Sequence, residues 1–296
     1  GIPVGFVLGV WIVRIAETGN ARAAFNSALA TTAALLRASA AQFGIGVAMG
    51  VGGTEVAKEA ADMVLTDDNF ATIEAAVEEG RAVFDNLIKF ITWTLPTNIG
   101  EGLVILVAVF AGVTLPITPV QILWINMTTA VLLGLTLAFE GKEPGLMERP
   151  PRRPETPVLT GELSFRIGLV SLMLVLGAFG LFEWALLHGE DVEKARTVAV
   201  NMFVFGEIFY LFNTRFLTAR SISLEGITGS RYVLMAAASV LAFQLLFTYL
   251  PVMQHFFATS DLSLASWLRI ITAGLIVFIL VEIEKAVIRR RISHAG

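Results

Sequence analysis

Four polar residues lie in two stretches that are otherwise apolar enough to cross a lipid bilayer. Asn98 and Glu101 lie in residues 87–112, and Asn126 and Thr129 lie in residues 120–139. A carboxylate in hydrocarbon is energetically expensive, and such residues usually mark the path of an ion or a proton. Hard cations such as Ca²⁺ take oxygen ligands from carboxylates and amides. The pattern therefore indicates a site for a transported cation.

The spacing within each stretch is three residues, so both members of a pair share one helix face. The connection between the two stretches is short, which predicts antiparallel neighbouring helices. The four side chains could then converge near the middle of the membrane. Pro96 precedes the first pair and lacks an N–H, so the carbonyl of Thr92 is freed and becomes a plausible further ligand.

A purely structural interpretation competes with this site. Asn126 or Thr129 alone would more simply bond one helix to another, and Glu101 could be protonated and paired. The neighbourhood of Pro96 and Asn98 favours the site for Glu101. Glu207, in residues 198–212, is a second acid within an apolar stretch, and the residues alone leave open whether it is a ligand or a structural carboxyl.

Composition indicates a membrane protein. Of 296 residues, 55% are hydrophobic and only 16% are charged, whereas soluble domains average about 25% charged residues. The net charge of −4 does not suggest nucleic acid as a partner. The absence of cysteine excludes disulfides and thiolate sites, and the scattering of the three histidines argues against a histidine metal site.

Six apolar stretches are long enough to be candidate spans. They are residues 87–112, 120–139, 165–187, 198–212, 232–250 and 268–287. One side of the predicted bundle is rich in Lys and Arg and should be cytoplasmic. On that side lie Lys142, Arg149, Arg152, Arg153, Arg215, Arg220, Arg231, Lys285, Arg289, Arg290 and Arg291. The N- and C-termini are then both expected in the cytoplasm, in an integral protein of the plasma membrane.

Residues 43–86 have a different pattern, typical of a small α/β element. Residues 43–50 and 62–66 predict strands, with a short helix at 54–61 between them. Asp67 or Asp68 is expected to cap the next helix, which begins near Ala71 and continues into the first span. Such a helix would act as a lever on Glu101. The Ala-rich residues 1–42 are left unassigned, and residues 87–290 form the six-span membrane domain.

These motifs resemble the P-type ATPases, in the branch of the calcium pumps. The segment 44–73 (GIGVAMGVGGTEVAKEAADMVLTDDNFATI) resembles the end of the HAD-like phosphorylation domain, and 81–91 (RAVFDNLIKFI) the linker helix. The other matching segments are 96–101 (PTNIGE), 122–129 (ILWINMTT), 142–154 (KEPGLMERPPRRP) and 203–215 (FVFGEIFYLFNTR). The resemblance implies a mainly α polytopic bundle of six spans with a remnant of the phosphorylation domain.

The resemblance also implies a ligand set. Asn98, Glu101, Asn126 and Thr129 match cation ligands, and Glu207 matches a ligand position in the fourth span. The family has an aspartate after the matching threonine, where this chain has Ala130. With one carboxylate fewer, a single ion or a different cation is more plausible than two Ca²⁺ ions.

The sequence lacks the two motifs that the resemblance associates with phosphoryl transfer. None of its aspartates is followed by Lys, as D-K-T-G-T requires, and no G-D-G-x-N-D precedes residue 43. Phosphoryl transfer needs positioned acids and Mg²⁺, so we expect no catalytic residue, no bound ATP or Mg²⁺ and no ATP hydrolysis by this chain alone. ATP and Mg²⁺ would serve the parent pump through its N-terminal part.

The prediction is therefore the C-terminal part of an ATP-driven cation pump, with the transported cation, the lipid bilayer and the N-terminal part as its partners. Two alternatives stay open at this point. A passive or proton-coupled secondary transporter would use Glu101 or Glu207 as a proton relay. An inactive membrane remnant would bind no cation.

Overall fold

The computed structural model describes residues 46–143, 145–152, 156–217, 219–223, 226 and 228–295, with side chains as far as Arg291. The predictions for residues 1–42 and for Arg153 therefore fall outside the described residues, as does the side chain of His294, one of the three histidines. Two compact units are distinguished. In the described part, the first holds the residues up to Asn86 together with 141–158, and the second holds 87–140 and 159–295. The mainly helical membrane fold with a small α/β element is confirmed.

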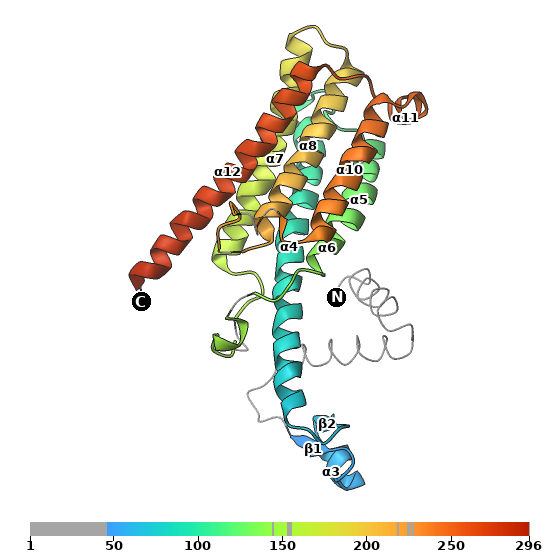
Figure 1. Cartoon of the computed structure of the whole chain (residues 1–296). Helices are drawn as coiled ribbons and strands as arrows, with labels where there is room; N and C mark the ends of the chain where they lie inside the picture. The colour runs from blue at the N-terminus through green and yellow to red at the C-terminus, as the bar shows by residue number, and fades with distance from the viewer. Residues whose placement is uncertain are drawn as a thin grey trace. The chain divides into compact units, whose positions relative to one another are not determined.

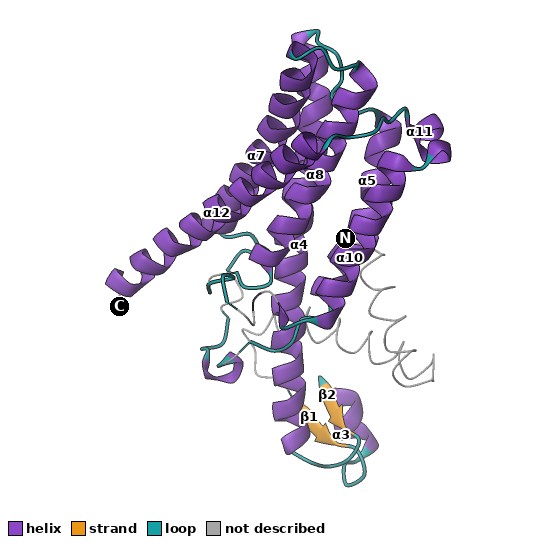
Figure 2. Ribbon diagram, turned by 45° about the horizontal axis from the view of Figure 1, so that its top comes forward, coloured by secondary structure: helices purple, strands orange, loops and turns teal. Residues whose placement is uncertain are grey.

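The first unit contains a β-α-β element (Figure 2). Strand β1 (Val47–Met49) pairs in parallel with β2 (Met63–Leu65), and Ala48 lies opposite Val64. Helix α3 (Glu55–Ala60) connects the strands and is capped by the Thr54 hydroxyl, which accepts from the Ala57 N–H. Strand β2 is shorter than the predicted 62–66, since its ladder with β1 has three residue pairs. Residues 43–45 of the first predicted strand fall outside the described residues.

Asp68 fixes the glycine loop of this element and does not cap the following helix. Its carboxylate accepts hydrogen bonds from the N–H groups of Val51 at 2.9 Å and Gly52 at 2.6 Å. These bonds, with that of Val51 first, hold the pKa of Asp68 below its ordinary value of 3.8. Asp67 instead accepts from the Thr72 hydroxyl. The prediction that either aspartate caps the helix is wrong, because both side chains are engaged elsewhere.

Residues 141–143 and 145–152 of the first unit form a connecting segment that binds to the N-terminal part of helix α4 (Ala71–Ala111). The Arg81 guanidinium donates to the carbonyls of Leu146 and Arg149, at 2.9 and 2.8 Å. Leu146 lies in the short 3₁₀ helix η2 (Leu146–Glu148). Arg149 in turn pairs with Asp85 at 2.7 Å. This connecting segment thus contains one turn of 3₁₀ helix and is bound to α4 through Arg81 and Arg149.

Among the residues that the structure describes, six helices are long and apolar enough to cross a membrane, which confirms the predicted six spans (Figure 1). They are α4, Pro119–Leu137, α7 (Gly161–Leu187), α8 (Val192–Thr214), α10 (Arg231–Tyr249) and α12 (Leu264–Ala295, counted as a span to Arg291). The second span is made of α5 (Pro119–Thr129), the π-helical segment η1 (Ala130–Gly134) and α6 (Leu135–Leu137). Helix α11 (Pro251–Phe257) lies between α10 and α12.

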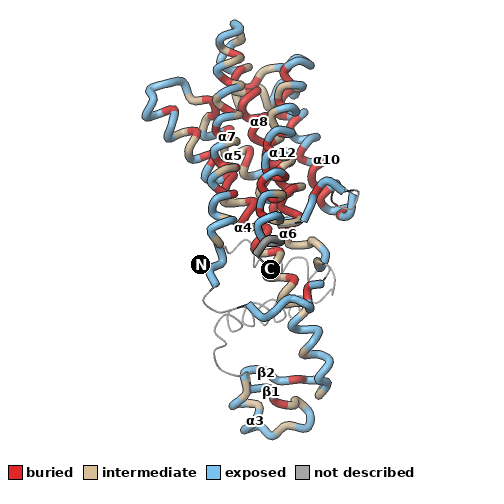
Figure 3. Tube along the Cα trace, turned by 90° about the vertical axis from the view of Figure 1, so that its left-hand side faces the viewer, coloured by how far each residue is buried: buried red, intermediate tan, exposed pale blue. Residues whose placement is uncertain are grey.

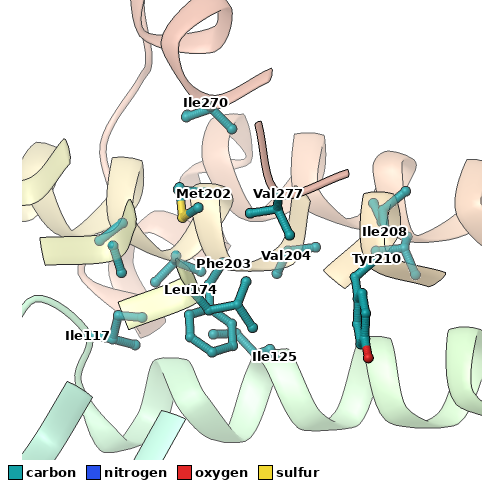
Figure 4. Packing of buried hydrophobic residues seen from close by; sticks show 14 of the residues in the cluster. Ile117, Ile125, Leu174, Met202, Phe203, Val204, Ile208, Tyr210, Ile270 and Val277 are labelled. Atoms are coloured by element: carbon teal, nitrogen blue, oxygen red, sulfur yellow. The ribbon is translucent and has the colours of Figure 1, made fainter. Parts of the chain in front are cut away.

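Helix α8 is the central helix of the second unit. In its most apolar stretch 78% of the residues are buried, compared with 28% in that of α12, and α8 packs most extensively against α12 and α7. Figure 3 shows buried residues along α8, with exposed residues along the outer helices. Phe203, Val204 and Ile208 of α8 belong to the same apolar core as Leu174 of α7, and Figure 4 shows Leu174 next to Phe203. Since α8 is buried all round, any polar group on it needs a partner within the bundle.

Candidate cation site

Three elements supply the predicted ligands: α4 carries Asn98 and Glu101, α5 carries Asn126 and Thr129, and α8 carries Glu207. A glycine precedes each acid and lets the helices approach closely. A Cβ on Gly100 would meet the Phe203 ring at 3.0 Å, and one on Gly206 would meet Leu174 at 2.5 Å. The backbone beside both acids is therefore closely packed against a neighbouring helix.

Glu101 and Asn126 are in direct contact. The Asn126 Nδ2 donates to Glu101 Oε2 at 2.6 Å, and the Glu101 side chain is 5% exposed. The contact crosses from α4 to α5, as expected for antiparallel neighbours joined by a short connection. The same Nδ2 also lies 3.2 Å from the carbonyl of Ile122 on its own helix. A carboxylate and an amide are thus in direct contact inside the apolar bundle.

Glu207 lies close to the same position. It is 2% exposed and lies near enough to Glu101 and Thr129 for electrostatic interaction, while the Thr129 hydroxyl itself donates to the carbonyl of Ile125 at 2.9 Å. One of its oxygens, Oε2, is buried without a hydrogen-bond donor among the described residues. A buried carboxylate oxygen without a donor is costly, and a bound cation or proton would offset that cost. The two acids, from α4 and α8, therefore face a common region.

Asn98 is placed differently from the other four residues. Its side chain is exposed, and its Nδ2 donates to the carbonyl of Thr94 on the same helix at 2.9 Å. The described contacts do not bring it to Glu101, although the two residues are three positions apart. A helix face spans a wide arc, so shared periodicity leaves room for one residue to lie inside the bundle and the other at its surface.

The carbonyl of Thr92, which Pro96 frees from the helical hydrogen-bond pattern, has a partner. The Tyr210 hydroxyl donates to it at 2.9 Å. Two further hydrogen bonds are made next to this point of α4. The Trp93 indole donates to the carbonyl of Glu207 at 3.1 Å. The Ser171 hydroxyl donates to the carbonyl of Pro96, also at 3.1 Å. The prediction that the Thr92 carbonyl is available to a cation needs this correction, since a protein donor already occupies it.

The second span changes its helical geometry next to the candidate ligands. Thr129 ends α5 and Ala130 begins η1, the segment of π-helix. Such segments are rare and frequent at functional sites, because the wider turn displaces side chains and backbone groups. Ala130, the residue that stands where the resemblance implies an aspartate, is thus placed at the start of this irregular segment. No feature of the sequence predicted it.

Other polar features of the described residues fit structural roles. The N–H groups of Val51 and Gly52 are bonded to Asp68, so this loop does not offer them to a phosphate group. Both N–H groups therefore stabilise the fold of the loop itself. Within the described ranges, no three His, Cys, Asp or Glu side chains gather as a metal site. A cation site here would depend on two acids with neutral oxygens.

A bundle of six apolar helices with two carboxylates buried at its centre defines an integral membrane protein with an internal ionisable site. Comparisons with known proteins give the family. The model of the family "Cation transporting ATPase, C-terminus" matches residues 114–287. The chain therefore belongs to the P-type cation-transporting ATPases and corresponds to their C-terminal part.

Named relatives agree with this assignment. The chain is 56% identical over 250 residues to the "Probable cation-transporting ATPase F" of Mycobacterium bovis, covering 84% of this chain and 28% of that protein. It is 34% identical to the "Calcium-transporting ATPase" of Bacillus subtilis, covering 78% of this chain and 26% of the relative. For the human "Calcium-transporting ATPase type 2C member 1" the identity is also 34%, with 83% of this chain and 27% of the relative covered. The chain thus spans little more than a quarter of these relatives.

Proposed function

We propose that this chain supplies the transmembrane cation site of an ATP-driven pump. The observation that carries the proposal is the convergence of Glu101 and Glu207 from two helices, with Asn126 bonded to Glu101 and Thr129 beside Glu207. Two carboxylates neutralise one divalent cation, and amide and hydroxyl oxygens extend its ligand shell. The substrate we propose is one hard divalent cation, of which Ca²⁺ is the first to test.

The role that we propose for Asn98 depends on a part of the pump outside this chain. It is exposed on α4, three residues from Glu101. A side chain in that position can reach a cation only if a further element of the pump covers this face of the helix. We propose that Glu101, Asn126, Thr129 and Glu207 form the inner part of the site and that Asn98 contributes from its open side.

ATP and Mg²⁺ would act in an N-terminal part like that of the relatives, because the sequence of this chain lacks the acids that phosphoryl transfer needs. The continuous helix α4, which begins beside the β-α-β element and carries Glu101, is the element through which we propose that the two parts communicate. A movement of the phosphorylation domain would then alter the position of Glu101. Grafting this chain onto the N-terminal part of the Mycobacterium relative tests the coupling: Glu101→Gln should abolish cation-dependent phosphorylation of the graft.

Cation binding by the chain itself is tested on purified protein in lipid nanodiscs. We expect saturable Ca²⁺ binding that Glu101→Gln weakens by at least tenfold, because the variant loses a charge that contacts the ion. Glu183→Gln is the matched control, since Glu183 is an exposed acid of α7. Equal effects of the two variants, or no binding by the unmodified chain, would refute the proposal. Repeating the titration with Mn²⁺ and Mg²⁺ ranks the cations.

We further propose that the protein lies in the plasma membrane with both termini in the cytoplasm. The support is the excess of Lys and Arg in the segments after the second, fourth and sixth spans. Because the chain has no cysteine, a single introduced cysteine reports its own side of the membrane. In intact cells, an impermeant thiol reagent should label His255→Cys and leave Thr156→Cys unlabelled, and the reverse pattern would contradict this orientation.

A further inference from the structure

Helix α4 contains a proline, Pro96, in its interior. In an α-helix the N–H of each residue bonds the carbonyl four positions earlier. Proline has no N–H, so α4 leaves the carbonyl of Thr92 without its helical donor. Thr92 is fully buried, and a buried carbonyl without a donor destabilises the fold in apolar surroundings. The helix can therefore cross the bundle here only if another element supplies a donor.

Helix α8 supplies that donor. The Tyr210 hydroxyl lies 2.9 Å from the Thr92 oxygen, and Tyr210 is completely buried. Figure 4 shows the hydroxyl oxygen of Tyr210 pointing away from Ile208 and the apolar cluster. The aromatic ring thus belongs to the core, while its one polar atom serves the backbone of α4.

A second bond runs in the opposite direction between the same two helices. The Trp93 indole N–H donates to the backbone carbonyl of Glu207 at 3.1 Å. Residue 93 follows Thr92, and Glu207 precedes Tyr210 by one helical turn. Each helix therefore donates one side-chain hydrogen bond to the backbone of the other. One of the two acceptors is the backbone carbonyl of Glu207, whose side chain is a candidate ligand.

These bonds lie close to the candidate site along both helices. Glu101 follows Pro96 by five residues, a rise of about 7.5 Å, and Glu207 is within one turn of Tyr210. We propose that Tyr210 is a positioning residue of the cation site: its hydroxyl replaces the N–H that Pro96 lacks, and thereby holds α4 and α8 in the register that places Glu101 beside Glu207. This inference rests on the proposed function, because it assumes that the two acids share a cation.

The test compares Tyr210→Phe in two backgrounds of the 296-residue chain in nanodiscs, with Ca²⁺ as the probe. The variant keeps the ring and loses only the hydroxyl. In the otherwise unmodified chain we expect Ca²⁺ affinity to fall about tenfold, because α4 and α8 are no longer held in the register that places the two acids together. With Pro96→Ala, residue 96 regains an N–H for Thr92, so adding Tyr210→Phe should weaken binding less than about twofold.

Tyr249→Phe is the matched control. Its hydroxyl also donates to a backbone carbonyl at 2.9 Å, that of Leu262, which lies before the start of α12 and is not a helical carbonyl that a proline has deprived of its donor. It should leave Ca²⁺ affinity within about twofold of the unmodified chain, while thermal unfolding reports any general loss of stability in each variant. An equal cost of Tyr210→Phe in both backgrounds would overturn the positioning role alone. Failure of the unmodified chain to bind Ca²⁺, Mn²⁺ or Mg²⁺ would overturn the proposed function and this inference together.

Discussion

The side-chain nitrogen of Asn126 lies 2.6 Å from Oε2 of Glu101, so that the first two membrane helices are joined at an acid. Asn98 also lies one turn from Glu101, yet it faces the surface and bonds its own helix. The two asparagines thus form a natural comparison, because they share a residue type and a candidate role but differ in contact with the carboxylate.

We predict that Asn126→Ala weakens Ca²⁺ binding by the 296-residue chain about tenfold or more, because it removes both an oxygen ligand and the donor that orients Glu101. Asn98→Ala should change the affinity of the same chain by less than about threefold. Calcium titrations of the two variants in nanodiscs measure the difference. A larger loss for Asn98→Ala would mean that the open face of α4 binds the ion.

A second prediction concerns a buried ion pair away from the site. Arg166 of α7 and Glu284 of α12 are both almost fully buried, with nitrogen and oxygen 2.8 Å apart. Removing one partner leaves an uncompensated buried charge, so Glu284→Leu should lower the free energy of unfolding by about 3–5 kcal/mol. Pairing it with Arg166→Met should restore a large part of that loss.

The control for this pair is Lys194→Met. It breaks the partly exposed pair of Lys194 with Glu190, which should contribute less than about 1 kcal/mol. Thermal unfolding in detergent compares the three variants. If Glu284→Leu cost no more than Lys194→Met, the pair between α7 and α12 would not stabilise the bundle.

A third prediction is a pH dependence in the β-α-β element. Because bonding to Val51 depresses the pKa of Asp68 below 3.8, the ionised carboxylate stabilises the loop at every pH above that ordinary value. Its contribution should be lost as the pH falls through the depressed pKa. Amide exchange of Val51 and Gly52, followed by NMR, should show protection that disappears in this acidic range.

Asp68→Asn is the matched variant for that measurement. Asp68 has a φ of 52°, which asparagine also tolerates, and the amide oxygen can still accept the two N–H bonds. Protection should therefore be weaker at neutral pH but no longer depend on pH. A variant that kept the acidic loss of protection would show that another group is responsible.

A fourth prediction addresses the segment bound by Arg81. Arg81→Lys keeps the charge but loses the planar group that donates to the carbonyls of Leu146 and Arg149. Hydrogen exchange of residues 145–152 should become several-fold faster. Lys58→Gln, which breaks only an exposed pair with Glu55, should leave that exchange unchanged. Identical exchange in the Arg81 variant would show that the segment is held by other contacts.

Much of the fold could be predicted because hydrophobic length is a local signal. All six spans were identified, but the fourth was predicted to begin at residue 198, whereas α8 begins at Val192. Lys194 and Arg196 lower the apolar character of its first turns. The structure explains Arg196, whose guanidinium donates to the carbonyl of Leu115, so a charged residue is accommodated within the first turns of the helix.

The candidate site could be predicted only in part, because contacts between distant helices are not a local signal. The acids were evident from their apolar surroundings, and Pro96 indicated that the Thr92 carbonyl would be freed, although it was predicted as a cation ligand. That the donor is Tyr210, which is 118 residues away, follows from the packing of α8 against α4. The orientation of Asn98 and the π-helical turn at Ala130 likewise depend on packing.

The central claim is that Glu101 and Glu207 bind the same cation, and a double-mutant cycle on Ca²⁺ affinity tests it most directly. The chain is titrated in nanodiscs as the unmodified protein, as Glu101→Gln, as Glu207→Gln and as the double variant. We predict one ion per chain, a loss of at least tenfold for each single variant, and a loss in the double variant well below the product of the two. Independent, multiplicative losses, or a Glu207→Gln variant that binds like the unmodified chain, would contradict the account.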